Sequence, residues 1–337
     1  MDVAVIGAGG IADVHLQNID VVDDVTLVGV CDLDGDRAVA KADPRGATVY
    51  TNHETLFAEE SFDVLFVHLP PTAHTNQVEM AAERDVDIFL EKPLPLSMEK
   101  ARELGTAIDD AGIVCQVGYM FRYAEIVERT RRLVEDRDLT LIRGQWFSGV
   151  PDSAWWKERE RSGGQVVTTT THVYDLVRYF GGGADEVSAY GSQTVVTDEI
   201  DFADTQAATI EHADGVVSQV ASTCTLGDDR QVDLLLVGDK FRLRLEFRTR
   251  TITGTIDGVS VSYREPDREY ADPTLDYYDT YSFHRRHDYD SEVRAFFDAV
   301  RAGDPDLVRS PYADALGTHE LTMGVNESLD TGELVSL

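Results

Sequence analysis

The chain has 337 residues, with 62 Asp or Glu against 30 Lys or Arg, so its formal net charge is −32. This length suits two domains, and an apolar fraction of 42% is ordinary for a globular protein. The negative charge argues against nucleic acid as a partner. The sequence contains no uninterrupted apolar stretch of about 18 residues, so we expect no membrane span.

Cysteine is scarce, at Cys31, Cys115 and Cys224, and no two cysteines have C-x-x-C spacing. This argues against a disulfide scaffold and a structural zinc site, and no His, Asp or Glu cluster has the spacing of a catalytic metal site. The sequence opens on an apolar run with no basic segment before it, so we expect no secretory signal and a cytoplasmic protein. The dispersed acids and only five lysines are typical of a protein from a salt-loving organism.

The first third of the chain alternates short apolar runs with helical patterns. We expect strands at 2–6, 25–31, 47–50, 63–67, 86–90 and 113–117, with helices between them, including 72–84 and 97–111. Strands that alternate with helices predict a doubly wound parallel sheet with helices on both faces. We assign residues 1–118 to such a Rossmann domain.

Beyond residue 118 the pattern changes. We expect a helix at 121–136, a strand at 139–147, a helix after His172, successive strands from about 186 to 264, and helices at 288–302 and 311–329. The strands alternate in steps of two, which predicts a second, α+β domain over 119–337 with a large, mostly antiparallel, open-faced sheet. The pair Arg285-Arg286 is interpreted as a solvated helix start.

A glycine-rich turn, Gly7-Ala8-Gly9-Gly10-Ile11-Ala12, follows the first strand and opens a helix. Gly7 permits a tight turn and Gly9 lets the backbone approach a pyrophosphate at the helix N-terminus. Asp32 ends the second strand at the spacing of an acid that binds a ribose 2′-hydroxyl. Its charge would repel a 2′-phosphate, so we expect NAD, with NADP as the alternative because Arg37 could offset that charge.

Lys92 follows the fifth strand in the segment Glu91-Lys92-Pro93. Open α/β sheets bind ligands at the carboxyl ends of their strands. An ammonium group there could stabilise the alkoxide that develops when a hydroxyl-bearing carbon loses hydride. On its own, however, the segment favours a surface lysine before a proline turn.

His172 ends a Thr run that follows two glycines, in Ser162 to Asp175. A histidine can act as a general base near neutral pH. Asp175 lies three residues later, on the same helical face, and could orient the imidazole. Four other histidines are isolated in the sequence and are interpreted as structural or surface residues: His15, His53, His212 and His319.

Together these motifs resemble the glucose-fructose oxidoreductase / inositol dehydrogenase / rhizopine-catabolism family over nearly the whole chain. The resemblance includes the glycine turn, Pro70 to His74, Glu91 to Pro93, Gln116 to Tyr119, Trp155-Trp156 and Ser162 to Asp175. It implies a nicotinamide-dependent oxidoreductase acting on a sugar, cyclic polyol or sugar derivative, commonly as a homodimer or homotetramer that associates through the open face of the second sheet.

The resemblance also implies site residues. Lys92 and His172 would act at the reacting hydroxyl, and the cofactor cleft would include Gly10, Ile11, Leu69, Pro70, His74 and Glu91. Arg122 and Tyr123 match a region that often touches substrate. Trp155 and Trp156 are adjacent and cannot both face one way, so we expect at least one to line the sugar pocket or an interface.

Thr168 stands where family members usually carry an acid, four residues before the histidine. A carboxylate there can hold a sugar hydroxyl or assist a proton relay, whereas a threonine only hydrogen-bonds. The resemblance leaves two alternatives open beside the dehydrogenase, and Thr168 supports the second of them. One is a glycoside hydrolase that retains its cofactor, and the other is a non-catalytic sugar sensor of the same fold.

The charge alone generates the first testable prediction. The 32 uncompensated negative charges repel one another on a compact surface and oppose folding. The Debye length falls from about 10 Å at 0.1 M salt to about 3 Å at 1 M, so concentrated salt hides neighbouring carboxylates from one another. We expect a folded, active protein in molar KCl that loses structure or activity on dialysis to low salt. In thermal melts across a KCl series, a midpoint that stays flat or falls would contradict this expectation.

Overall fold

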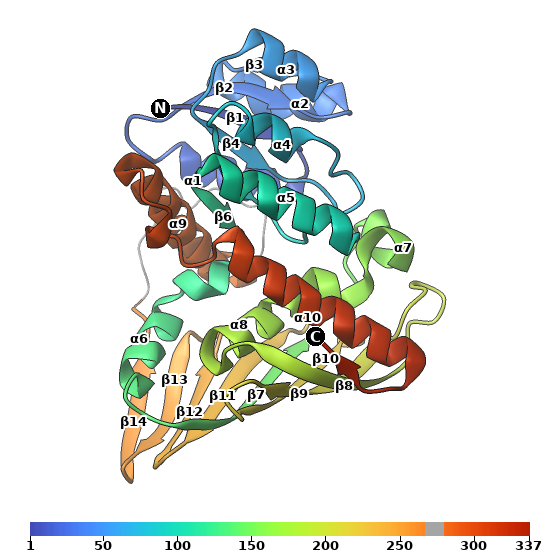
Figure 1. Cartoon of the computed structure of the whole chain (residues 1–337), viewed down its shortest axis with the longest axis vertical. Coiled ribbons are helices and arrows are strands. Elements are labelled where there is room, and N and C mark those ends of the chain that lie inside the picture. Colours follow the sequence, from blue (N-terminus) through green and yellow to red (C-terminus); the bar gives the residue numbers. More distant parts are fainter. Residues whose placement is uncertain (267–279) are drawn as a thin grey trace. The chain divides into compact units, whose positions relative to one another are not determined.

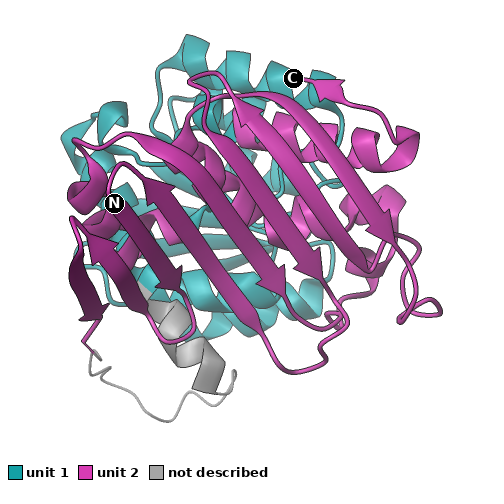
Figure 2. Ribbon diagram, turned by 90° about the horizontal axis from the view of Figure 1, so that it is seen from below, with its two compact units in different colours: residues 1–120, 288–316 teal, residues 121–287, 317–337 magenta. Residues whose placement is uncertain are grey.

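The computed structural model describes residues 1–266 and 280–337, with side chains at 1–266 and 288–337, so the Arg285-Arg286 side chains lie outside the described residues. The chain divides into two compact units (Figure 2). Unit 1 comprises residues 1–120 and 288–316, and unit 2 comprises residues 121–287 and 317–337. Unit 1 thus contains a C-terminal segment in addition to the stretch expected to form the first domain.

Unit 1 is built on a parallel sheet of six strands in the order β3-β2-β1-β4-β5-β6 (Figure 1). This is the strand order of a Rossmann fold, which places the topological switch point between β1 and β4. The six expected strands are confirmed to within two residues at each end. They are β1 (Asp2–Ile6), β2 (Thr26–Cys31), β3 (Thr48–Tyr50), β4 (Val64–Val67), β5 (Asp87–Leu90) and β6 (Cys115–Val117).

Alternation along the strands gives this sheet two apolar faces. In β1, Ala4 and Ile6 belong to one buried cluster while Val3 and Val5 belong to the other. The helices are α1 (Gly10–Ile19), α2 (Gly35–Ala42), α3 (His53–Glu59), α4 (Gln77–Ala82), α5 (Met98–Ala111), α9 (Thr280–Ala302) and α10 (Tyr312–Thr331). The first cluster includes residues of α5 and the start of α10, and the second includes residues of α1 and of the second half of α9.

The helix expected at 72–84 is wrong at its start, because α4 begins only at Gln77. The preceding residues form a loop, in which the side chains of Thr75 and Gln77 make hydrogen bonds to neighbouring groups. These bonds take the place of a regular helical turn. The helix expected at 121–136 is also shorter. A 3-10 turn at Met120–Tyr123 comes first, and α6 (Glu125–Val134) follows it.

Unit 2 is built on a nine-stranded sheet in the order β14-β13-β12-β11-β7-β10-β9-β8-β15. Among the strand pairs of the described residues, only β7 and β10 are parallel, which confirms the large, mostly antiparallel sheet. The strands are β7 (Leu139–Phe147), β8 (Ala184–Ser192), β9 (Thr205–His212), β10 (Val217–Thr223), β11 (Gln231–Gly238), β12 (Phe241–Glu246), β13 (Thr251–Ile256), β14 (Val259–Arg264) and β15 (Val335–Ser336).

Helix α8 (Thr171–Gly181) packs on one face of this sheet, against β7 and β10. The approach is close at Gly144 of β7, where a Cβ atom would lie 2.3 Å from a methyl of Val173. A glycine is therefore required at this point of the strand. The short helix α7 (Arg159–Ser162) and a π-helical turn (Val166–Thr170) precede α8.

Figure 2 looks onto the other face of the nine-stranded sheet, which no described helix of unit 2 covers. In β9, exposed residues that face this side alternate with buried residues along the whole strand from Thr205 to His212. We call this surface the open face. Its central strands contribute Arg143, Gln145, Ala207, Thr209, Gln219, Ala221, Leu235 and Arg242.

Within the described residues, no helix combines the length and the apolar character needed to cross a lipid bilayer.

Candidate cofactor and catalytic sites

The glycine turn after β1 has the geometry of a phosphate-binding loop. Gly7 has φ of +95°, and a Cβ on it would lie 2.3 Å from the carbonyl oxygen of His68, so no other residue fits there. Gly9 faces open space, with no atom within 4 Å of an added Cβ. No side chain caps the N-terminus of α1 at Gly9. The first N–H groups of α1 can therefore receive an anion.

Asp32, directly after β2, is tied to this turn. Its Oδ2 accepts a hydrogen bond from the Ala8 N–H at 2.7 Å, and its Oδ1 accepts one from the Asp34 N–H at 2.8 Å. Both contacts are with backbone groups, so they hold the carboxylate in a single orientation at the end of the strand. Asp32 thus lies beside the glycine turn, where the sequence predicts it.

Further acids surround Asp32 in the loop that leads into α2. Asp34 caps α2 by accepting from the backbone N–H groups of Asp36 and Arg37. The Arg37 side chain forms an exposed ion pair with Asp34, at 3.2 Å between Nε and Oδ2. Arg37, which could neutralise a 2′-phosphate here, already has an acidic partner, although an exposed pair of this kind is weak.

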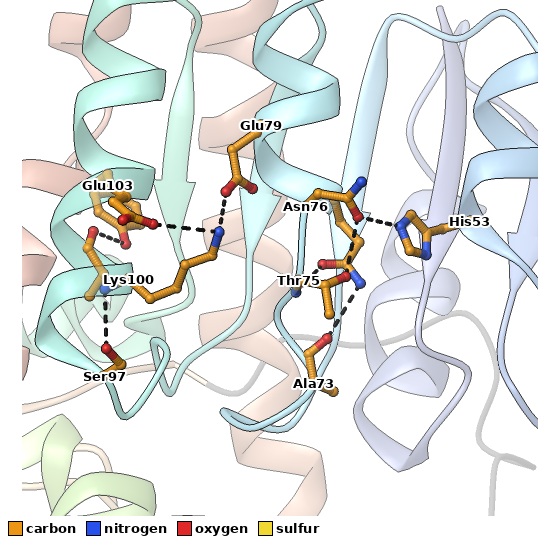
Figure 3. A network of polar contacts seen from close by, with 11 residues as sticks. His53, Ala73, Thr75, Asn76, Glu79, Ser97, Lys100 and Glu103 are labelled. Carbon is orange, nitrogen blue, oxygen red and sulfur yellow. Dashed lines mark hydrogen bonds and ion pairs between the residues drawn. The ribbon is translucent and has the colours of Figure 1, made fainter.

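The connection between β4 and α4 carries Leu69, Pro70 and His74, all half-buried. Side-chain bonds brace the end of this loop (Figure 3). Asn76 Oδ1 accepts from His53 Nε2 at 2.7 Å and from Thr75 Oγ1 at 3.2 Å. The loop that carries His74 is thus anchored to the start of α3 by His53, which was interpreted from the sequence as a structural or surface residue.

A second set of bonds joins α4 to α5. The Lys100 ammonium donates to Glu79 of α4, and the Lys100 N–H donates to Ser97 Oγ, which caps α5 (Figure 3). These contacts fix the two helices that follow β4 and β5. The loop segments at the carboxyl ends of those strands are therefore held at both ends.

Lys92 lies at the carboxyl end of β5, as expected, and its bond to Pro93 is cis. The side chain of Glu91, just before it, is buried, and its Oε2 accepts from the Lys92 N–H at 3.0 Å. Oε1 of the same carboxylate accepts from His15 Nε2 at 2.7 Å. The Lys92 backbone is therefore positioned by a buried carboxylate rather than by a flexible surface turn.

His15, isolated in the sequence, has a structural role in the fold, as one of the two interpretations of the sequence had it. It is fully buried on α1 and stacks on His68, with ring centroids 4.8 Å apart and planes 13° from parallel. Burial, and secondarily the neighbouring His15, hold the pKa of His68 well below its usual value, so His68 is neutral at physiological pH. The partnership between His15 and Glu91 joins residues 76 positions apart, and no local motif pointed to it.

In unit 2, His172 is buried near the start of α8. Its ring stacks near Trp146 of β7, at 5.9 Å between centroids, and lies 5.4 Å from the ring of Phe121. The π-helical turn just before α8 widens the backbone at Thr168, whose hydroxyl donates to the Gly164 carbonyl at 2.8 Å. Such turns occur frequently at functional sites.

Asp175 forms a buried ion pair with Arg122. Oδ1 and Oδ2 of Asp175 accept from Nη2 and Nε of Arg122 at 2.6 and 2.8 Å, and Oδ1 also accepts from Thr318 of α10. The guanidinium of Arg122 additionally lies over the ring of Tyr179. These contacts bind α8 to neighbouring elements of unit 2. They give Asp175 and Arg122 a role in holding the helix that carries His172.

The adjacent tryptophans are not equivalent. Trp156 is buried in a small apolar cluster with Ile200, Phe202 and Cys224, while Trp155 packs against the edge of that cluster and is only half-buried. Tyr123, like Arg122, is buried. Trp155 is therefore the most accessible of the residues of unit 2 that are expected to contact substrate.

Comparison with known proteins agrees with these features. The sequence model described as "Oxidoreductase family, NAD-binding Rossmann fold" (GFO/IDH/MocA) matches residues 1–119, and the GFO/IDH/MocA C-terminal domain model matches residues 129–244. A D-xylose 1-dehydrogenase (NADP(+)) of Haloferax volcanii is 26% identical over 312 residues, covering 89% of each chain.

Two solved structures share the whole fold. GenD2 from gentamicin A biosynthesis, in complex with NAD, has a TM-score of 0.84 at 23% identity, over 100% of this chain and 96% of that one. A levoglucosan dehydrogenase in complex with NADH and levoglucosan has a TM-score of 0.85 at 19% identity, over 100% and 99%.

Proposed function

The chain belongs to the GFO/IDH/MocA oxidoreductase family, and on that premise we propose that it is an NAD-dependent dehydrogenase of a sugar, cyclic polyol or sugar derivative. The reaction would move a hydride between a hydroxyl-bearing carbon of the substrate and the nicotinamide. Two of the similar proteins described above, a D-xylose 1-dehydrogenase and a levoglucosan dehydrogenase, support this substrate class.

The observation that carries the proposal is the arrangement at the carboxyl ends of β1, β2 and β5. The glycine turn, Asp32 and Lys92 lie at these strand ends, on one edge of the sheet. Gly7 has no room for a side chain, and no protein atom lies within 4 Å of a Cβ added at Gly9. A pyrophosphate could therefore approach the backbone of this turn closely. These residues fit a dinucleotide, which when bound supplies the hydride acceptor or donor.

The two catalytic roles follow from the chemistry of the side chains. The ammonium of Lys92 would stabilise negative charge on the substrate oxygen as hydride leaves the carbon. The imidazole of His172 would take the hydroxyl proton as general base, or return it in the reverse direction. Asp175 and Arg122 would support this step by holding α8 in place, and Trp155 would contact the sugar.

A cofactor-retaining hydrolase and a non-catalytic sugar sensor are the two alternatives to the dehydrogenase, and Thr168 favours the sensor. The hydroxyl of Thr168 bonds to the Gly164 carbonyl and supplies no carboxylate for a proton relay. Reduced cofactor that accumulates with substrate would identify the dehydrogenase. Free sugar released from an aryl glycoside without net reduction would identify the hydrolase, and sugar binding without either product would identify the sensor.

Replacing the catalytic residues tests the proposal. We expect Lys92→Ala and His172→Ala each to lower kcat by about 100-fold or more, the usual scale for a positioned acid–base group, with NAD binding retained in His172→Ala. Lys240→Ala, in an exposed turn of unit 2, is the matched control and should turn over normally. Near-normal steady-state rates in either active-site variant would mean that the site is misassigned.

Cofactor preference is set by Asp32. We expect kcat/KM to be higher with NAD than with NADP, because a 2′-phosphate would face a carboxylate held by Ala8 and Asp34. Asp32→Asn keeps an acceptor for these N–H groups but removes the charge, and should raise the NADP-to-NAD ratio about 10-fold. Asp36→Asn is the control for a charge elsewhere in the same loop and helix. A wild-type preference for NADP would contradict the assignment.

The open face is proposed as the contact between copies in a homodimer or homotetramer. Arg143 and Arg242 stand exposed on it in a chain of strong negative charge, where they could pair with acids of a second copy. We expect light scattering in high salt to give a dimer or tetramer, and Arg242→Glu to shift the population toward monomer. A monomeric wild-type protein would refute the assembly.

A further inference from the structure

His15 occupies a junction in unit 1 that no sequence motif revealed. It lies on α1, five residues after the first residue of the helix that follows the glycine turn. Its ring contacts the rings of His68, Phe66 and Phe89, and Tyr289 meets it edge-on at 5.6 Å. The imidazole is fully buried, and its Nε2 bonds to Glu91.

The Glu91 carboxylate divides its two oxygens between different parts of the fold. Oε1 accepts from His15 of α1, and Oε2 accepts from the N–H of Lys92. Gly118 leaves the room for this carboxylate, because a Cβ at that position would lie 2.9 to 3.0 Å from its atoms. One buried group thus joins the helix of the glycine turn to the peptide of the proposed catalytic lysine.

If His15 and Glu91 only filled space in the core, they would not need to be polar. A buried carboxylate is costly unless donors satisfy it, and apolar residues of similar size could fill the space between α1 and β5. The imidazole supplies a donor with a fixed direction, and the stack on His68 limits rotation of the ring. The direction of the Glu91 side chain, and with it the Lys92 peptide, is therefore determined from α1.

We propose that His15 is a positioning residue for Lys92, which acts through the Glu91 carboxylate and couples the glycine turn to the lysine. The inference rests on the proposed dehydrogenase function. A misplacement of about 1 Å at a reacting group can cost up to 100-fold in rate, so a hydrogen bond remote from the chemistry can have a large effect on turnover.

A matched pair of variants separates hydrogen bonding from packing. His15→Gln keeps an N–H at about the distance of Nε2 but loses the aromatic ring, while His15→Phe keeps a ring and loses the donor. We expect kcat to fall about 10- to 100-fold in His15→Phe and to stay within about threefold of wild type in His15→Gln, with little change in NAD affinity. If His15→Phe does not fold, His15→Met replaces it as the variant without a donor.

Non-additivity provides the second measurement. If His15 acts only through Lys92, His15→Phe should lower kcat no further in a Lys92→Ala background. Tyr50→Phe removes another side-chain bond to a carboxylate, that between Tyr50 and Glu60, and serves as the control expected to leave kcat unchanged. Equal losses in His15→Gln and His15→Phe, or additive losses with Lys92→Ala, would overturn the positioning role.

Lysine labelling tests the same idea without turnover. Trace acetylation followed by mass spectrometry resolves each of the five lysines, and Lys41 and Lys240 serve as internal references. We expect the labelling rate of Lys92, relative to these references, to change several-fold in His15→Phe and not in His15→Gln. If wild type reduces no cofactor with any sugar or polyol, the proposed function fails. An unchanged Lys92 labelling rate would instead refute the role of His15.

Discussion

The buried carboxylate of Glu91 is the constraint on which the cofactor half of the molecule depends. A carboxylate removed from water must be surrounded by donors, and here these come from α1 and from the backbone of Lys92. The same requirement explains Gly118, whose missing side chain leaves room for the group. Three segments that are distant in sequence are therefore positioned by the solvation demand of one side chain.

The strands of unit 1 could be predicted closely from the sequence, because a parallel strand buried on both faces is a short apolar run bounded by polar turns. Val64 to Val67 is such a run, and every residue in it is buried. The helix after it was predicted too early. Thr75 and Asn76, which the prediction placed in this helix, have side chains that form hydrogen bonds within the loop and to His53. Such bonds compete with helical hydrogen bonding, and apolar periodicity does not reveal them.

The site divides in a similar way. The glycine turn, Asp32 and Lys92 belong to contiguous motifs, and the structure places them at strand ends on one edge of the first sheet. The partnerships of His15 with Glu91 and of Arg122 with Asp175 span 76 and 53 residues. One sequence contains no signal that pairs such residues. Asp175 illustrates the consequence, since helical spacing suggested only its neighbour His172, whereas the carboxylate also accepts hydrogen bonds from Arg122, a partner that local spacing does not indicate.

The distribution of charge separates the surface from the site. Most acids among the described side chains are exposed, where their repulsion is long-ranged and depends on ionic strength. The ion pairs of Arg122 with Asp175 and of Arg250 with Glu265 are buried, and their side chains are no more than 6% exposed. Salt screens buried pairs far less than exposed ones. Concentrated salt can therefore relieve repulsion across the surface while the hydrogen bonds that hold α8 and Glu91 keep their strength. An acidic surface and a precisely positioned polar interior are thus compatible in one chain, because they respond to different parts of the electrostatic environment.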